Sequence, residues 1–257
     1  MRRVLLAATV LLATTVAGRA EESVEPRSVV IISQGSDGHP AGTHEFRAGS
    51  EILKRILNGY EGVSATVVDA EKSPGKVVEA IDGADGVVLF VSQGARWVGS
   101  DAGRREAMER LAARDGGITA LHWAVGAKDA RYIEIGKRLW GGVHGGPDRR
   151  YTVSRAQMVP NEEHPITKGL EPLTIRDEWY HHLKFAREPA VVPLWTVEIK
   201  GEPQVVSWAW EREDGGRSFG FVGLHFHQNW EEEAYREFVG RGVVWTVGRV
   251  KGEVISR

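Results

Sequence analysis

The chain has 257 residues, of which 42% are hydrophobic and 26% charged, a composition typical of a globular protein rather than a disordered or fibrous one. A formal net charge of −2, without a basic stripe interleaved with aromatics, argues against a nucleic-acid partner. The absence of cysteine excludes a thiol nucleophile and thiolate metal ligands.

The first residues have the build of a secretory signal peptide. Two arginines precede an apolar run over residues 4–16, and small residues at 17–20 offer a cleavage site. We expect a signal peptide over residues 1–20, with an uncleaved anchor as the alternative. A single mature domain over residues 21–257 would then work in the periplasm or outside the cell. No later segment approaches the roughly 20 apolar residues of a membrane span, so none is expected after cleavage.

Strands and helices are predicted to alternate through the first half of the chain. Short apolar, β-branched runs predict strands at 28–33, 63–69, 86–91 and 118–122. Helical spacing between them predicts helices around 52–57, 77–81 and 102–112, the last beginning at Asp101 as N-cap. This alternation is typical of βα units in a parallel sheet.

The second half has a different pattern. After a helix at 130–139, strands are predicted at 151–159, 173–175, 191–199, 204–210 and 219–224, with a hairpin signal at Asp214-Gly215-Gly216. A helix at 235–246 closes the chain. This half is expected to add antiparallel strands, and no linker marks a second domain.

Histidines at the ends of two buried strands are the first candidates for chemistry. His122 is the last residue of the strand at 118–122, and ligands of open α/β sheets bind outside the carboxyl ends of strands. The alternative is a structural histidine bonded to a nearby carbonyl. His225 and His227 follow the strand at 219–224; two positions apart in a strand, they would face the same side and could share a ligand. His122, His225 and His227 are therefore predicted to bind a divalent ion such as zinc or manganese, or to act as acids and bases without metal.

Further candidates lie in loops and beside these histidines. Glu178, in a cluster of acidic and aromatic residues, is a candidate acid/base group, because an apolar setting raises a carboxyl pKa; the alternative is a surface turn. Substrate contacts are expected from loop residues and from aromatic wall residues, although ordinary loops and core aromatics remain alternatives. The loop residues are His39, His44, Glu45 and His144, and the wall residues are Trp97, Trp123, Trp179 and Trp230.

As a set, these motifs resemble the ThuA-like (trehalose-utilisation) family, over about residues 29–248. The matching segments are Asp37-Gly38-His39, Gly42-Thr43-His44-Glu45, Gly116–His122, His144-Gly145, His164–Gly169, Asp177–Tyr180, Gly216–Phe219, His225 with His227, and Gly242–Trp245. The resemblance implies an α/β, flavodoxin-like or class I glutamine amidotransferase-like fold. Its central sheet would be mostly parallel and flanked by helices, with extra antiparallel strands in the C-terminal half. The amidotransferase relatives would hold a nucleophilic cysteine at the position of His122, so glutaminase chemistry is excluded here.

The family's association with trehalose and oxidised (3-keto) sugars suggests an exported carbohydrate-processing enzyme, such as a keto-sugar isomerase, lyase or hydrolase. His122, Glu178, His225 and His227 would be its catalytic residues, with acid/base or metal-assisted chemistry. The alternative is a non-catalytic exported carbohydrate-binding protein. The sequence does not reveal the oligomeric state.

Overall fold

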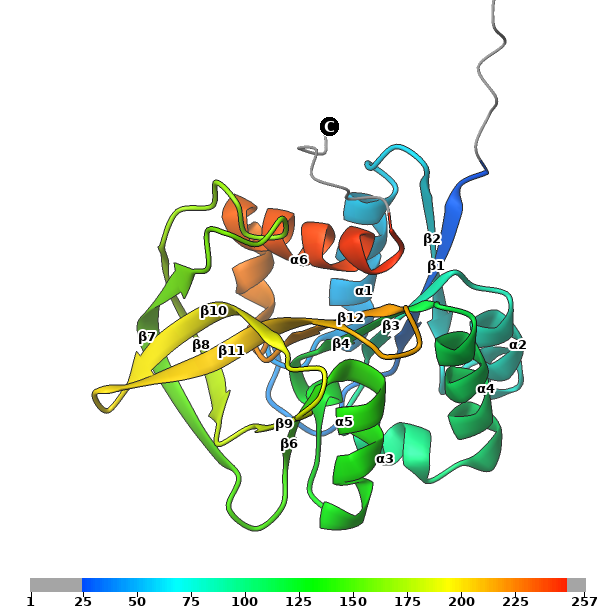
Figure 1. Ribbon diagram of the computed structural model, residues 1–257, viewed down its shortest axis with the longest axis horizontal. Coiled ribbons are helices and arrows are strands. Elements are labelled where there is room, and N and C mark those ends of the chain that lie inside the picture. Colours follow the sequence, from blue (N-terminus) through cyan, green and yellow to red (C-terminus); the bar gives the residue numbers. More distant parts are fainter. Residues whose placement is uncertain (1–24, 249–257) are drawn as a thin grey trace, which may run out of the picture.

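Nine strands form one mixed sheet in the computed structural model, which describes residues 25–248. Five of them run parallel in the order β2-β1-β3-β4-β12 (Figure 1). They are β1 (Arg27–Ser33), β2 (Val63–Asp69), β3 (Gly86–Phe90), β4 (Gly117–Leu121) and β12 (Arg217–Phe221). This is the strand order of flavodoxin-like sheets. The predicted signal peptide lies outside the described residues.

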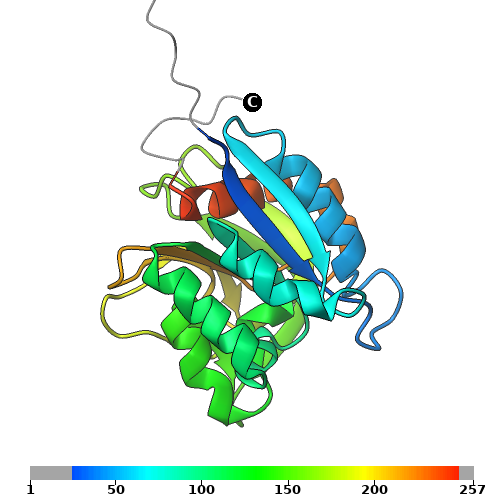
Figure 2. The same ribbon diagram turned by 90° about the vertical axis from the view of Figure 1, so that its right-hand side faces the viewer.

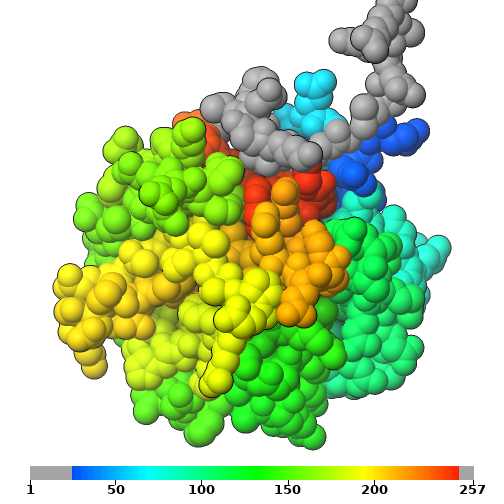
Figure 3. All heavy atoms as spheres, viewed as in Figure 1, coloured from blue at the N-terminus to red at the C-terminus, as the bar shows by residue number. Residues whose placement is uncertain are grey.

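Four antiparallel strands extend the sheet beyond β12, in the order β11-β10-β7-β8. They are β7 (Arg150–Pro160), β8 (Leu173–His181), β10 (Val192–Ile199) and β11 (Glu202–Glu211). The predicted hairpin lies between β11 and β12, where Gly215 has φ +91°. The β10–β11 hairpin projects from the body at the left of Figure 3. The predicted fold class is thus confirmed: parallel central strands carry extra antiparallel strands from the C-terminal half.

Helices cover both faces of the parallel strands (Figure 2). They are α1 (Phe46–Leu57), α2 (Val77–Asp82), α3 (Gly94–Gly99), α4 (Ala102–Ala113), α5 (Ile133–Trp140) and α6 (Glu233–Thr246). Helices α1 and α6 pack on one side, and α2 to α5 on the other. The predicted N-cap is confirmed, since Asp101 accepts a hydrogen bond from the Arg104 backbone N–H at 2.8 Å. None of the helices in residues 25–248 combines the length and apolar character needed to cross a membrane.

Short elements complete the fold around the second half of the chain. A small sheet contains β5 (Gly126–Ala127), β6 (Gly142–Gly145) and β9 (Lys184–Phe185). The 3-10 helices are η1 (Pro74–Lys76), η2 (His122–Val125), η3 (Ala130–Tyr132) and η4 (His227–Glu231).

The core explains why the parallel strands are almost continuously apolar. The inner parallel strands are covered on both faces, so Ile31, Ile32, Val88 and Leu89 have no exposed surface, whereas the edge strand β2 alternates buried and exposed residues. Burying aliphatic side chains of this size contributes about 1.5–3 kcal/mol each before the entropy cost. The parallel strands therefore form a rigid support for the residues that follow their carboxyl ends.

Two predicted strand boundaries are wrong. Strand β8 continues past Ile175 to His181, so Glu178 lies within a strand and not in a surface turn. Strand β12 ends at Phe221 and not at Leu224, which has φ +79° and turns the chain. His225 and His227 are consequently not alternate residues of one strand.

Candidate functional site

His122 lies at the carboxyl end of a central strand, as predicted, one residue beyond the end of β4. Its side chain is fully buried, and its Nδ1–H donates to the Val222 carbonyl at 2.9 Å. Because a carbonyl can only accept, Nε2 of the neutral ring carries the lone pair. The backbone has φ +52°, a left-handed conformation that is uncommon for a residue with a Cβ. Such conformations cluster at functional sites, where the surrounding structure enforces them.

His44 reaches the same place from the loop that follows β1. It too is buried and left-handed, with φ +50°, and its Nδ1–H donates to Asp37 Oδ2 at 2.9 Å. Backbone bonds from His44 N to the His225 carbonyl (3.1 Å) and from His227 N to the Gly42 carbonyl (2.8 Å) join this loop to the late turn. The Asp37 carboxylate thus directs the free Nε2 of His44 toward His122.

His225 is positioned by the buried carboxylate of Asp177. Oδ2 accepts from Leu224 N and Asn229 Nδ2, both at 2.9 Å, and Oδ1 accepts from His225 N at 3.1 Å. The Tyr235 hydroxyl also donates to Oδ2. These bonds fix the turn after β12 and the position of the imidazole that follows it.

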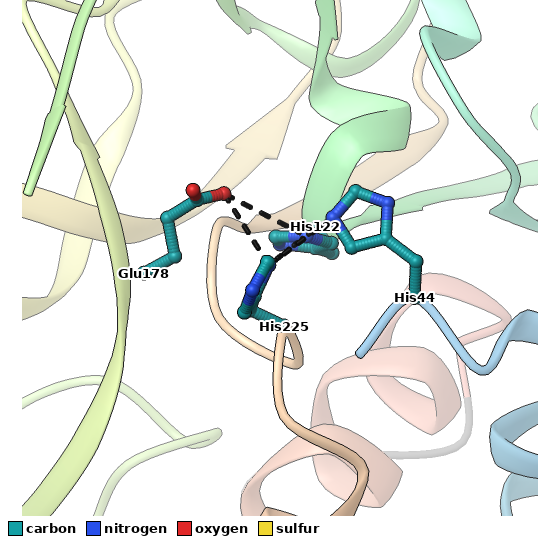
Figure 4. Close-up of side chains that lie close together, drawn as sticks. All are labelled: His44, His122, Glu178 and His225. Carbon is teal, nitrogen blue, oxygen red and sulfur yellow. Dashed lines mark hydrogen bonds and ion pairs between the residues drawn. The ribbon is translucent and has the colours of Figure 1, made fainter. Parts of the chain in front are cut away.

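Three ring nitrogens converge where these segments meet (Figure 4). His44 Nε2 lies 2.9 Å from His122 Nε2 and 3.1 Å from His225 Nδ1. His225 Nδ1 lies 3.4 Å from His122 Nε2. Two of the three nitrogens already present lone pairs, so hydrogen bonds among neutral rings cannot satisfy all three contacts.

The electrostatic environment favours neutral imidazoles here. Burial lowers the pKa of His122 well below its usual value, and the neighbouring His44 lowers it further. Burial, followed by the charges of His44 and His39, lowers the pKa of His225 to about 4. At neutral pH these rings are therefore in the form that coordinates a cation.

The donor set fits a divalent metal ion such as zinc. Histidine nitrogens about 2.0–2.1 Å from a tetrahedral ion would be about 3.3 Å from one another. The three observed separations, 2.9, 3.1 and 3.4 Å, lie close to that value. The other ring nitrogen of His44 donates to a carboxylate, and that of His122 donates to a backbone carbonyl. This is the usual arrangement around histidine ligands.

Glu178 stands at the edge of this cluster, on β8. Its Oε2 lies 3.5 Å from His225 Nδ1 and 4.0 Å from His122 Nε2, farther than the nitrogens lie from one another. Burial raises the pKa of Glu178 to about 7, assisted by the charge of Asp177 and opposed by a hydrogen bond from Tyr180. The side chain is 11% exposed, so this carboxyl group can meet both the cluster and a substrate.

A second imidazole binds the same Asp37 carboxylate from outside. His39 Nδ1–H donates to Asp37 Oδ1 at 2.6 Å, and the His39 ring stacks on His44 with centroids 3.6 Å apart. Although burial acts in the opposite direction, hydrogen bonds from His44, Ser92 and His39 hold the pKa of Asp37 well below its usual range. The His39 side chain is 41% exposed and lies at the mouth of the site.

His144 and Trp123 line the inner side of the site. His144 stacks on Tyr180 with centroids 4.2 Å apart, and Tyr180 in turn stacks on His122 at 5.3 Å. Trp123 packs against both His144 and Tyr180. Both residues are almost completely buried, so they shape the site from behind.

Other predicted site residues lie elsewhere. His227 begins η4 outside the histidine cluster, because the chain turns at Leu224 instead of continuing as a strand. Trp179 is wrong as a wall residue: it is fully buried, on the face of β8 opposite Glu178, and its Nε1–H donates to the Ser154 carbonyl. Trp230 packs against Phe90 in the core.

Two further predicted contacts have structural roles. The Arg104 guanidinium lies over the Trp97 ring, with Cζ 4.4 Å from the ring centroid. Glu45 accepts a hydrogen bond from the Gly42 backbone N–H at 3.0 Å, which closes the loop that carries His44.

Sequence reasoning missed four roles in this site. His44 was predicted to contact substrate but lies in the cluster itself, and Asp37, Asp177 and Tyr180 were assigned no role. For Asp37 and His44, the available signal was the glycine-rich loop that contains both of them together with His39. Nothing in the local pattern distinguishes Asp177 from Glu178 as the buried anchor.

Comparison with known proteins places these features in a family. The family model described as ThuA, trehalose utilisation, matches residues 29–246. Among proteins with curated functions, none matches the chain. The structure is similar to that of a ThuA-like protein from Bacteroides uniformis, with a TM-score of 0.66 and 16% identity over 93% of this chain and 97% of the other.

Two other solved structures share the fold at low identity. A cytoplasmic protein of Salmonella typhimurium, STM3548, has a TM-score of 0.57 and 12% identity over 86% of this chain and 98% of the other. A β-galactosidase from Halorubrum lacusprofundi matches through 30% of its own length and 86% of this chain, with a TM-score of 0.52 and 13% identity. Since the family model covers most of its length, the chain belongs to the ThuA family, whose description connects it with carbohydrate utilisation.

Proposed function

We propose that the protein is an exported, metal-dependent enzyme that acts on a sugar or keto sugar. The observation that carries this proposal is the convergence of three imidazole nitrogens within 3.4 Å, with a carboxylate beside them. The family's connection with trehalose utilisation supports a carbohydrate as substrate. The signal-like residues 1–20 support export.

His44, His122 and His225 would hold the ion, and Glu178 would exchange a proton with the substrate. A divalent cation in such a site polarises a carbonyl oxygen and makes the hydrogen on the adjacent carbon more acidic. Three protein ligands leave a coordination position for substrate. Glu178 is the farthest of the four donors and is partly exposed, which suits a group that must reach the substrate carbon.

Tyr180 and His39 would support this chemistry from two sides. The Tyr180 hydroxyl donates to Glu178 and lies 3.4 Å from His122 Nε2, so it orients the carboxylate within the site. His39, held by Asp37 at the mouth, would contact the hydroxyl groups of the sugar.

Metal content is the first test. Elemental mass spectrometry on the untagged mature protein should find about one divalent ion per chain, retained in His182→Asn. His182 is an exposed histidine with φ +58°, a conformation that asparagine tolerates, so it is a matched control. The ion should be lost in His44→Ala, His122→Ala and His225→Ala.

Turnover tests the second part. Proton exchange next to the carbonyl of 3-keto sugars, followed by NMR in deuterium oxide, should be lost in Glu178→Gln while the metal stays bound. A protein that binds and returns every sugar unchanged would instead be a carbohydrate-binding protein, and full exchange in Glu178→Gln would disprove the assigned role of this carboxyl group.

A further inference from the structure

Exposed apolar side chains gather on one face of β7. Four large hydrophobic residues are noticeably exposed within residues 25–248, and three of them lie on this strand: Tyr151 (62%), Val153 (41%) and Val159 (46%). They occupy alternate positions, so they point to the same face of the sheet. Scattered apolar residues need no explanation, but an alternating row on one strand face does.

The strand register places Tyr151 and Val153 beside the proposed active site. In the antiparallel β7–β8 pair, Val153 lies directly opposite Glu178, and Tyr151 lies opposite Tyr180. Residues directly opposite each other share a face, with Cβ atoms about 5 Å apart. A molecule that contacts Glu178 from solvent therefore lies next to Val153, with Tyr151 one step farther along the strand.

The two faces of the β7–β8 hairpin differ in how they are covered. On one face, Ile175, Asp177 and Trp179 are buried under the core, whereas the face with Glu178 is left open on β7. Among the described residues, no hydrogen bond or ring contact engages the Tyr151 side chain. An exposed tyrosine ring beside a reactive group is a typical platform for an amphipathic ligand.

Cationic groups border this face on its other side. The next opposed pair along the hairpin is Arg155 with Arg176, and the Arg176 guanidinium lies 4.2 Å from the ring centroid of Phe226. Phe226 follows His225 directly, so this border adjoins the histidine cluster. Guanidinium donors suit the hydroxyl groups of a sugar, and the apolar ring of Tyr151 suits its C–H face.

From this arrangement we infer a second subsite, formed by Tyr151 and Val153, that binds the ring attached to the sugar held at the metal. The inference rests on the proposed function. It assigns the substrate to a defined class: glycosides that carry a second ring, such as disaccharides and aryl glycosides, in preference to monosaccharides.

Calorimetric titration of the metal-loaded mature protein tests this subsite. The probes are p-nitrophenyl α- and β-D-glucoside, each compared with D-glucose. The protein should bind one of the two glucosides about tenfold more tightly than glucose, since one aromatic contact with its buried area contributes roughly this factor. Tyr151→Ser should abolish most of that preference, and Val153→Ser should reduce it, with glucose affinity and metal content unchanged.

Val159→Ser is the matched control, because Val159 is about as exposed as Val153 and lies on the same strand face, about 20 Å from it along the strand. It should change neither affinity. Equal affinity of the parent for glucose and both glucosides, or a loss of affinity for all three in Tyr151→Ser, would overturn the subsite. So would light scattering that shows a parent dimer and a Tyr151→Ser monomer, since the face would then bind a second copy. A parent that holds no metal would instead overturn the proposed function.

Discussion

The carboxylate of Asp177 accepts hydrogen bonds from the backbone N–H groups of both Glu178 and His225, at 2.8 and 3.1 Å. One buried side chain therefore joins β8 to the turn that carries a histidine of the cluster. It governs the distance between the proposed acid/base group and the proposed metal ligand without contacting either functional group.

Asp177→Asn should weaken metal binding by about 10- to 100-fold, the usual effect of losing a partner behind the ligands. An amide replaces one of the two acceptor oxygens with an NH2 group, which is a donor and cannot accept the hydrogen bonds that this oxygen now accepts. Competition with a chelator measures the affinity. Tyr235→Phe, which removes one donor and keeps the carboxylate, should show a smaller effect in the same direction, and Asp148→Asn on the surface should show none. Unchanged affinity in both buried variants would contradict the positioning role.

Tyr180→Phe should reduce turnover by about 10- to 100-fold while the metal stays bound. The hydroxyl donates to Glu178, and a hydrogen bond to a charged group contributes about 1.5–3 kcal/mol. Steady-state kinetics on a keto sugar, with metal content measured in the same sample, checks this. Tyr132→Phe is the control, since its ring packs beside Arg131 away from the cluster. Full turnover in Tyr180→Phe would show that Glu178 is oriented without this hydroxyl.

Acid stability should depend on His164. Burial, followed by the charge of Arg217, lowers the pKa of His164 to about 4 from an ordinary 6.5. Because the folded-state pKa is the lower one, the unfolded chain binds this proton more readily than the folded one. The free energy of unfolding is therefore unaffected by His164 above about pH 6.5 and falls as the pH drops toward 4. His164→Asn keeps an acceptor for the Ile166 N–H and should reduce the acid-induced loss by about 2 kcal/mol, allowing for partial exposure.

Denaturant unfolding at pH 7 and at pH 4.5 measures this difference. His182→Asn, at an exposed position, should leave the acid-induced loss unchanged. An identical pH dependence for the parent and His164→Asn would show that His164 does not contribute.

Arg212 should be essential for stability rather than chemistry. Its buried guanidinium donates to the Gly116 carbonyl (2.8 Å), the Arg217 carbonyl (3.0 Å) and Ser218 Oγ (2.9 Å), which anchors the β11–β12 hairpin to the start of β4. Lysine cannot make these bonds at once, so Arg212→Lys should cost about 3 kcal/mol in unfolding free energy. Arg187→Lys, at an exposed position, should cost almost nothing, and equal melting temperatures for the two variants would contradict the anchor role.

Much of the fold could be predicted from the sequence, because buried parallel strands are continuous apolar runs. The prediction of His122 at the end of β4 needed only that pattern. The prediction for His227 failed since the turn at Leu224 depends on Asp177, a tertiary contact 47 residues away in the chain. The convergence of His44 with His225, 181 residues apart, has no local signal at all. Glu178 was singled out by its acidic and aromatic neighbours and lies beside the histidine cluster, although its strand was predicted to end too early.

The loop that contains Asp37 and His44 contacts the late turn through a few backbone bonds and through the histidine cluster. A bound ion would therefore join three segments that are remote in sequence, and its removal would leave this loop held weakly and open to proteases. We expect the amount of intact protein in its compartment, and not only its activity, to follow the local supply of the metal.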